Sequence, residues 1–159
     1  QGAHGMSAPR DQQIIDALVG LLKTITVANG YRTDAGLYVF DEEDRERDVP
    51  DDAIATEIID TDETLRAQNR KEREADLRIR IDALVPWETT PKPRAAARNA
   101  LADYRQAIAT INQPPGWIKG VTNVALGGRR IPPRVAGSAY VEASLDVQVT
   151  YIETHTRSN

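Results

Sequence analysis

The sequence predicts an α+β domain of two layers, in which two helices cover a mostly antiparallel or mixed β-sheet of about four to five strands. Apolar residues recur with helical spacing in 9–27 and 93–112. They alternate with polar residues in 76–85 and 140–153, as in strands that bury one face. Most of the expected strands follow one another without a crossover helix, which favours antiparallel pairing and places both helices on one face.

The first helix is expected over residues 9–27. Ser7 is a plausible N-cap, Pro9 suits the first turn, and Asn29-Gly30 tolerates the left-handed conformation that ends helices. Its apolar stripe consists of Ile14, Leu18, Leu21, Leu22 and Ile25.

The second helix is expected over residues 93–112. Thr90 is a plausible cap, and Pro91 or Pro93 lies in the first turn. Its apolar stripe consists of Ala97, Leu101, Tyr104, Ile108 and Ile111.

Both alternating strands are expected to bury one row of side chains, and three weaker strands are expected at 37–40, 53–61 and 117–126. The polar segment 62–75 fits either a long hairpin or a short helical segment, and glycines and prolines predict a loop over 127–138. The buried rows are Leu77, Ile79, Ile81, Ala83 and Val85 in the first strand, and Val141, Ala143, Leu145, Val147, Val149 and Tyr151 in the second.

Length and composition predict a single domain over residues 6–153. Residues 1–5 are interpreted as a cloning remnant, and 154–159 as a flexible C-terminal tail. No apolar run is long enough to cross a membrane, and there are no cysteines for disulfides, thiolate nucleophiles or thiolate metal sites. The formal net charge of −4 disfavours non-specific binding to duplex DNA.

Catalytic motifs are not found, so no cofactor, metal site or enzyme activity is expected. His155 is the single histidine outside the cloning remnant, and the chain has no G-x-S-x-G elbow, phosphate-binding glycine loop or calcium-loop spacing. The acidic run 41–52, with eight acids and two arginines, reads as a solvated loop.

Arg129, Arg130 and Arg134 flank the sequence Ile-Pro-Pro in the late loop. They are interpreted either as an arm that engages an acidic partner or a phosphate backbone, or as a loop kept soluble by its arginines. Trp87 and Trp117 lie at element edges, where tryptophan is either partial core or an interface anchor.

Residues 28–40, "ANGYRTDAGLYVF", also allow two interpretations. They are either a helix exit followed by a strand entry, or a binding loop. In the second interpretation Asp34 turns the chain through its own backbone, and Tyr31 and Arg32 then lie at an interface.

The segment "IIDALVGLLKTITVANGYRTDAGLYVF" resembles the start of tail-terminator and tail-completion proteins of long-tailed phages and prophages. In that family an amphipathic helix leads into a G-Y-x-T-D-x-G motif and then a strand. Gly30, Tyr31, Thr33, Asp34 and Gly36 hold the motif here. The later strands and helix are similar in layout, whereas the specific match is confined to the first third of the chain.

The resemblance implies a structural protein of the virion tail, assembled in the bacterial host cytoplasm. Such proteins form a ring, typically a hexamer, on the tail tube protein, stop tube growth and present a surface to the head–tail connector protein. DNA only passes through the lumen, and no membrane is involved.

A ring of identical subunits needs two unlike, complementary patches on each subunit. The acidic stretch 41–52 and the arginine-rich stretches 66–73 and 129–134 are candidates, and their charges would steer assembly and fix register. The alternatives are a neighbouring head–tail joining protein or, from another class, a small enzyme or regulatory binding domain.

Overall fold

The computed structural model describes residues 8–41, 48–111 and 117–154, and it confirms the predicted α+β class. Two helices pack on one five-stranded mixed sheet. In chain order the elements are α1 (Arg10–Leu22), a 3-10 turn η1 (Val27–Asn29), β1 (Val39–Asp41), β2 (Ala55–Gln68), β3 (Glu72–Pro86), α2 (Pro93–Ala109), β4 (Val121–Arg130) and β5 (Tyr140–Thr154).

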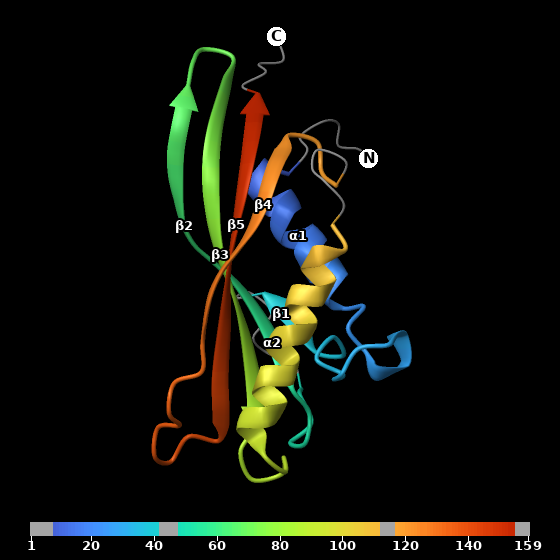
Figure 1. Ribbon diagram of the computed structural model, residues 1–159. Coiled ribbons are helices and arrows are strands. Elements are labelled where there is room, and N and C mark those ends of the chain that lie inside the picture. The colour runs from blue at the N-terminus through green and yellow to red at the C-terminus, as the bar shows by residue number, and fades with distance from the viewer. Residues whose placement is uncertain (1–7, 42–47, 112–116, 155–159) are drawn as a thin grey trace.

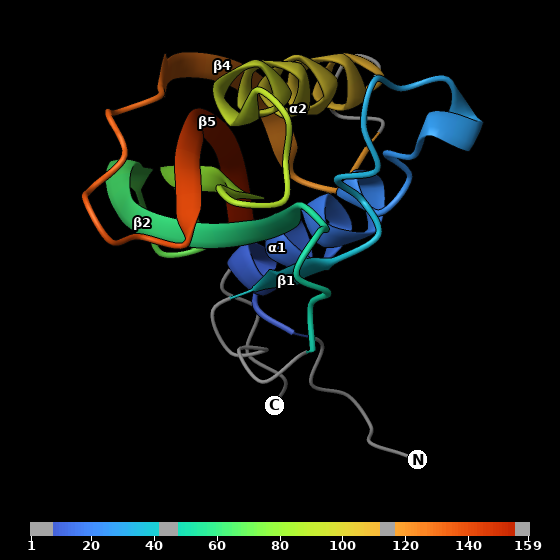
Figure 2. The same cartoon turned by 90° about the horizontal axis from the view of Figure 1, so that it is seen from below.

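The strands lie in the order β1-β2-β3-β5-β4. The short strand β1 runs parallel to β2, and every other neighbouring pair is antiparallel. The sheet is strongly twisted, as sheets of long antiparallel strands are. Its strands therefore cross one another steeply in Figure 1. Both helices lie on one side of the sheet, and the view from below shows the strands curving around them (Figure 2).

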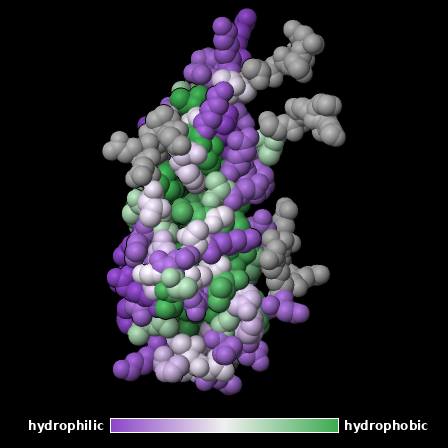
Figure 3. Space-filling view, turned by 90° about the vertical axis from the view of Figure 1, so that its right-hand side faces the viewer, coloured by the Kyte–Doolittle hydropathy of each residue, from purple (hydrophilic) through white to green (hydrophobic). Residues whose placement is uncertain are grey.

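The core lies between the sheet and the helices, and it contains the rows of side chains that the alternation predicted. Both expected rows, on β3 and β5, are buried along their whole length. From α1 and α2 the predicted stripes are buried except for Leu21 and Ile111, which are partly buried at the margin. On the side of the molecule that carries the helices, hydrophobic residues run through the middle of the face and hydrophilic residues flank them (Figure 3).

The first helix ends at Leu22, earlier than the predicted residue 27. The following residues 24–27 are Thr-Ile-Thr-Val, all β-branched, and such side chains lose rotamer freedom in a helix. The hydroxyl of Thr24 also donates to the carbonyl of Leu21 at 2.6 Å, which turns the chain out of the helix. Gly30 does adopt the left-handed conformation, with φ of 92°, but it ends η1 and not α1.

The second helix begins at the predicted residue Pro93 but without the expected cap. Its N-cap is Lys92, with φ of 51° and no side-chain capping bond, so the prediction for Thr90 was wrong. A following proline disfavours the right-handed helical conformation and favours an extended one, so the left-handed backbone of Lys92 is unusual. Ser7, the expected cap of α1, lies outside the described residues.

The segment 62–75, for which hairpin and helix were both open, forms the distal half of the β2–β3 hairpin. Asn69 makes its turn, because its side-chain oxygen accepts hydrogen bonds from the backbone N–H groups of Lys71 (2.8 Å) and Glu72 (3.0 Å). Residues 42–47, half of the acidic run 41–52, lie outside the described residues, and Asp41 belongs to β1.

The fourth strand is displaced from its predicted range of 117–126. It starts at Val121 and continues through Arg130, into the predicted loop 127–138. Gly127 and Gly128 read as a loop signal, yet they form an irregularity in the pairing with β5 between Leu126 and Arg129. Glycine in a strand often marks such a bulge.

Gly36 lies where the chain passes closest to the end of α1. Its N–H donates to the carbonyl of Ile25 at 2.8 Å. A Cβ at this position would lie 2.6 Å from that carbonyl oxygen and 2.8 Å from the amide nitrogen of Ile25. Both are backbone atoms, so only a shift of the chain would admit a side chain.

Gly36→Ala is therefore expected to destabilise the protein by about 2 kcal/mol, the typical cost of forcing extra volume into a packed site. Gly20→Ala is the matched control, because nothing lies within 4 Å of a Cβ on Gly20 in α1. That change is expected to stabilise by about 0.5–1 kcal/mol through helix propensity. Urea unfolding of both variants measures the difference, and equal stabilities would contradict the close approach.

Candidate functional site

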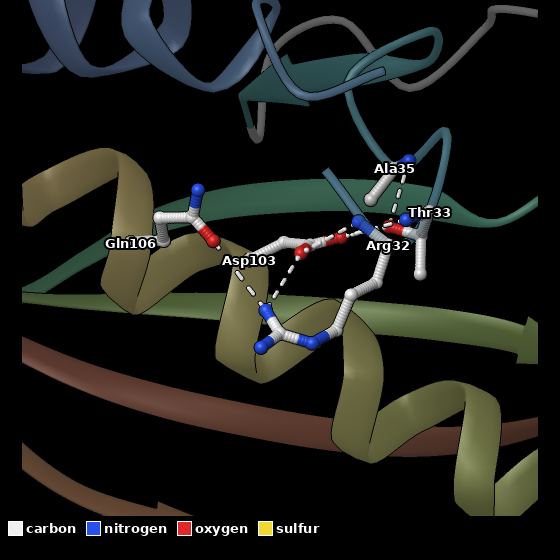
Figure 4. A network of polar contacts seen from close by, with 5 residues as sticks. All are labelled: Arg32, Thr33, Ala35, Asp103 and Gln106. Carbon is white, nitrogen blue, oxygen red and sulfur yellow. Dashed lines mark hydrogen bonds and ion pairs between the residues drawn. The ribbon is translucent and has the colours of Figure 1, made fainter. Parts of the chain in front are cut away.

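Asp103, a residue of α2 that is 0% exposed, organises the segment that carries the G-Y-x-T-D-x-G motif. One carboxylate oxygen accepts from the N–H of Arg32 at 3.0 Å. The other accepts from the N–H and the hydroxyl of Thr33, at 2.8 and 2.7 Å (Figure 4). A buried carboxylate is tolerated when hydrogen bonds replace its hydration. Asp103 thus fixes the motif segment onto α2.

The side chain of Arg32 has a separate place from its backbone. Its guanidinium Nη1 lies 3.6 Å from the carboxylate of Asp103 and 3.4 Å from the side-chain oxygen of Gln106. The side chain is 55% exposed, so this ion pair contributes little to stability. The backbone of Arg32 serves the fold, whereas its guanidinium points toward Asp103 and Gln106 (Figure 4) on a side chain that is more than half exposed.

A chain of buried hydrogen bonds continues from the motif into the sheet. The carbonyl of Ala35 accepts from the hydroxyl of Thr56 in β2 at 2.8 Å, and that hydroxyl lies 2.6 Å from the phenol oxygen of Tyr104 in α2. Burial raises the pKa of Tyr104, so its phenol keeps its proton. Hydrogen bonds between buried polar groups thereby join α2, the motif segment and β2.

Asp34 turns the chain, as its Asx character predicted, and its side chain bonds to an earlier part of the chain. Its carboxylate accepts from the N–H of Val27 at 2.8 Å, and its carbonyl accepts from the N–H of Leu37 at 3.0 Å. Tyr31 is half-buried and packs on the margin of the core. The structural interpretation accounts for Thr33, Asp34 and Gly36, while an interface role for Tyr31 and Arg32 stays a prediction.

The three arginines singled out in the sequence divide into two places. Arg129 and Arg130 are exposed at the end of β4. Arg134 lies on the ring of Trp87, with its guanidinium carbon 4.2 Å from the ring centroid, and donates to the carbonyl of Ser138 at 2.6 Å. Arg134 therefore holds the β4–β5 connection in place, and only Arg129 and Arg130 have the exposure expected of a charged contact.

The surroundings of Trp87 include an exposed tyrosine that sequence reasoning did not single out. Trp87 is 42% and Tyr140 40% exposed, and both line one surface pocket with Arg134. Tyr140 pairs with Pro86 at the start of β5, so the two aromatic residues come together through the β3–β5 register. Trp117 is half-buried beside the core.

Polar side chains on the far face of the sheet form ion pairs and hydrogen bonds that sequence reasoning missed. Asp82 accepts from Arg80 Nε and from the hydroxyl of Ser144, each at 2.9 Å. The hydrogen bond to Asp82 raises the pKa of Arg80. Arg80 and Asp82 both belong to the polar row that the alternation indicated in β3. Ser144, on β5, becomes visible as a partner only with the pairing register.

A second cluster lies at the distal end of the β2–β3 hairpin, where Glu63 accepts from the hydroxyl of Tyr151 and from Arg73. Burial and the hydrogen bond to Glu63 raise the pKa of Tyr151. Among residues 8–41, 48–111 and 117–154, histidines, cysteines and acids do not gather into a group that would hold a metal ion. Neither described helix has the length and apolarity of a membrane-spanning segment.

Asp103→Ala is expected to destabilise the protein by about 3 kcal/mol, because it leaves buried donors of Arg32 and Thr33 without an acceptor. Asp103→Asn is expected to cost less but still more than 1 kcal/mol, since its amide group turns one accepting site into a donor. Gln106→Ala, one turn along the exposed side of α2, is the control and is expected to stay within about 0.5 kcal/mol. Urea unfolding checks all three, and a neutral Asp103→Ala would refute the anchoring role.

No family model and no curated protein matches the sequence. Among solved structures, the sheath/tube terminator of PVC, an extracellular contractile injection system, in its extended state is similar with a TM-score of 0.45 and 14% identity. The similarity covers 96% of this chain and 59% of the other. The type 4 fimbrial biogenesis protein PilO from Pseudomonas aeruginosa is similar with a TM-score of 0.34 and 11% identity, over 93% of this chain and 73% of the other. These remote likenesses come from two different machineries and do not decide the function of this chain.

Proposed function

We propose that this protein is a structural component of a phage or prophage tail, a tail terminator that caps the tail tube as a ring of copies. The ring would be a hexamer, would meet the tail tube protein on one side and the head–tail connector protein on the other, and would let DNA pass through its lumen. The protein would act in the virion tail after assembly in the bacterial host cytoplasm. Its work would be done by binding, without making or breaking a covalent bond.

The observation that carries this proposal is the way the family motif is built into the fold. Thr33, Asp34 and Gly36 each make a contact that joins the end of α1 to α2 or to the chain entering the sheet. A motif with these positions therefore encodes a particular packing of helices on a sheet. The resemblance in sequence and the contacts in space support the same structural class.

Two exposed features are available for contacts with other subunits. The pair Arg129 and Arg130 at the end of β4 is one, and the exposed guanidinium of Arg32 beside half-buried Tyr31 is the other. They lie on different elements and both are basic, so in a head-to-tail ring each would meet an acidic surface of a neighbouring molecule. Because Arg134 is held by Trp87 and Ser138, we assign it to the support of the loop that follows Arg129 and Arg130.

Deleting the gene in an inducible prophage is expected to give tail tubes of uncontrolled length, seen by electron microscopy of induced lysates. Wild-type protein supplied in trans should restore uniform length. Arg129→Glu/Arg130→Glu should fail to do so, because reversing charges at an interface weakens assembly. Arg98→Glu/Arg105→Glu, a matched reversal on exposed positions of α2, is the control and should restore it.

Tails of normal length that fail to join heads would replace the terminator proposal with that of a neighbouring head–tail joining protein. Normal, infectious particles from the deletion would contradict both. Comparable amounts of each variant protein in the lysate, measured by immunoblot, separate loss of assembly from loss of folding.

A further inference from the structure

The sheet ends in two unlike open edges. Strand β1 covers the outer side of β2 only from Thr56 to Ile58, and no described strand lies along that side from there to Gln68. At the opposite edge, β4 pairs with β5 on one side, and no described strand lies along the other. An open edge presents unpaired N–H and C=O groups to any strand that fits.

We propose that copies of this protein join head to tail by antiparallel pairing of the β4 edge of one copy with the distal β2 edge of the next. This inference rests on the proposed function, because it names the contact that closes the ring. The occupant of each edge is a second copy of this chain. Three observations argue for it. Each edge has a short stretch of regular pairing, the two stretches lie on the same rungs of the sheet, and the edges carry opposite charges.

Each edge contains one regular window between two irregularities. In β2 the pairing with β3 is shifted between Asp60 and Asp62 and again between Leu65 and Ala67, so Asp62–Leu65 is regular. In β4 it is shifted between Val121 and Asn123 and again between Leu126 and Arg129, so Asn123–Leu126 is regular. Bulges restrict pairing along an edge. They leave four residues on each side with the geometry that an added strand needs.

The two windows lie at the same height in the sheet. Following the paired residues across β3 and β5, Asp62 shares a rung with Ala125. By the same route Thr64 shares a rung with Asn123. If the sheet continues from copy to copy along these rungs, the window of β4 lies directly beside the window of β2 in the next copy. β2 and β4 run in opposite directions, so that pairing would be antiparallel.

The charges of the two edges are opposite. From Ile58 to Leu65, β2 carries the acids Asp60, Asp62 and Glu63 and no basic residue. Two of these acids lie against arginines of β3 in the same chain, Asp62 at 3.9 Å from Arg78 and Glu63 bonded to Arg73. β4 carries Arg129 and Arg130 and no acid. Head-to-tail contact therefore sets unlike charges against each other.

One pair of opposite charges, Asp60 and Arg129, lies on nearby rungs at the two edges. Arg129 shares a rung with Ile58, two residues from Asp60. Both Ile58 and Asp60 pair with buried residues of β3, and Arg129 pairs with buried Leu145, so Asp60 and Arg129 lie on the helix-bearing face. Because β1 already pairs with this side of β2 up to Ile58, β4 of the next copy would leave the new ladder before Arg129, and the side chains of Asp60 and Arg129 would approach each other on the helix-bearing face beyond the end of that ladder. A two-fold contact of β2 with β2, or of β4 with β4, would instead oppose like charges.

Cross-linking tests the contact directly, because the chain has no cysteine of its own. Asp62→Cys protein is mixed at high concentration with Asn123→Cys, Val124→Cys, Ala125→Cys or Leu126→Cys protein and oxidised. Directly opposed residues in antiparallel strands lie within disulfide reach. The mixture with Ala125→Cys is expected to link best, whereas each variant alone should stay unlinked. No link in any of the four mixtures, or efficient linking of one variant with itself, overturns the proposal.

A charge exchange tests the same contact without a covalent bond. Asp60→Arg alone and Arg129→Glu alone are each expected to weaken self-association about tenfold, measured by light scattering over a concentration series. Mixing the two variants should restore association, because each repelling edge then has a complementary neighbour, and so should both changes in one chain. Arg105→Glu is the control and should leave association unchanged. Variants that weaken association but are not rescued by mixing would overturn the proposed pairing.

These results separate the contact from the function. Cross-linked copies with normal tails after gene deletion would refute the terminator and leave the contact standing. Tubes of uncontrolled length without any cross-link would refute the contact and leave the terminator standing.

Discussion

The arrangement of this fold depends on the hydrogen bonds that the buried carboxylate of Asp103 accepts. It lies on α2, yet its hydrogen bonds go to the backbone of Arg32 and the backbone and hydroxyl of Thr33, seventy residues earlier in the chain. A buried anion without these donors would be unfavourable by several kcal/mol, so helix and loop must come together in one geometry. That geometry in turn sets Gly36 against the end of α1 and brings Ala35 to Thr56 of β2. Both helices are thereby held over one face of the sheet.

The alternation and periodicity of the sequence predicted the two-layer class, both long central strands and the buried rows, because these depend on local patterns of apolar side chains. They failed where a local signal had two meanings. Gly127-Gly128 indicates a loop in the sequence but forms an irregularity within a strand. Ile25 continues the helical stripe in the sequence, but the β-branched residues Thr24 to Val27 lie beyond the end of α1. The polar segment 62–75 has no apolar pattern of its own. Its hairpin depends on pairing with β5 and on the Asn69 turn.

The candidate site was predictable in part for the same reason. Thr33, Asp34 and Gly36 stood out as a motif, but their common partner Asp103 did not, because a lone acid in a helix gives no sign that it is buried. The arginines of the late loop looked like one cluster in sequence, and the structure separates Arg134, on Trp87, from Arg129 and Arg130. The position of the β2 acids relative to Arg129 could not be predicted without the pairing register. The register places Asp60 and Arg129 on nearby rungs at opposite edges.

A sheet covered on one face by both helices and open at two oppositely charged edges is suited to continue from copy to copy. Hydrogen exchange at low and high protein concentration tests this central claim most directly, since it reports on individual backbone N–H groups. The account predicts that concentration slows exchange in Asp62–Leu65 and Asn123–Leu126 together, while the exposed surface of α2 is unchanged. Slower exchange confined to other surfaces, or in one window without the other, would contradict it.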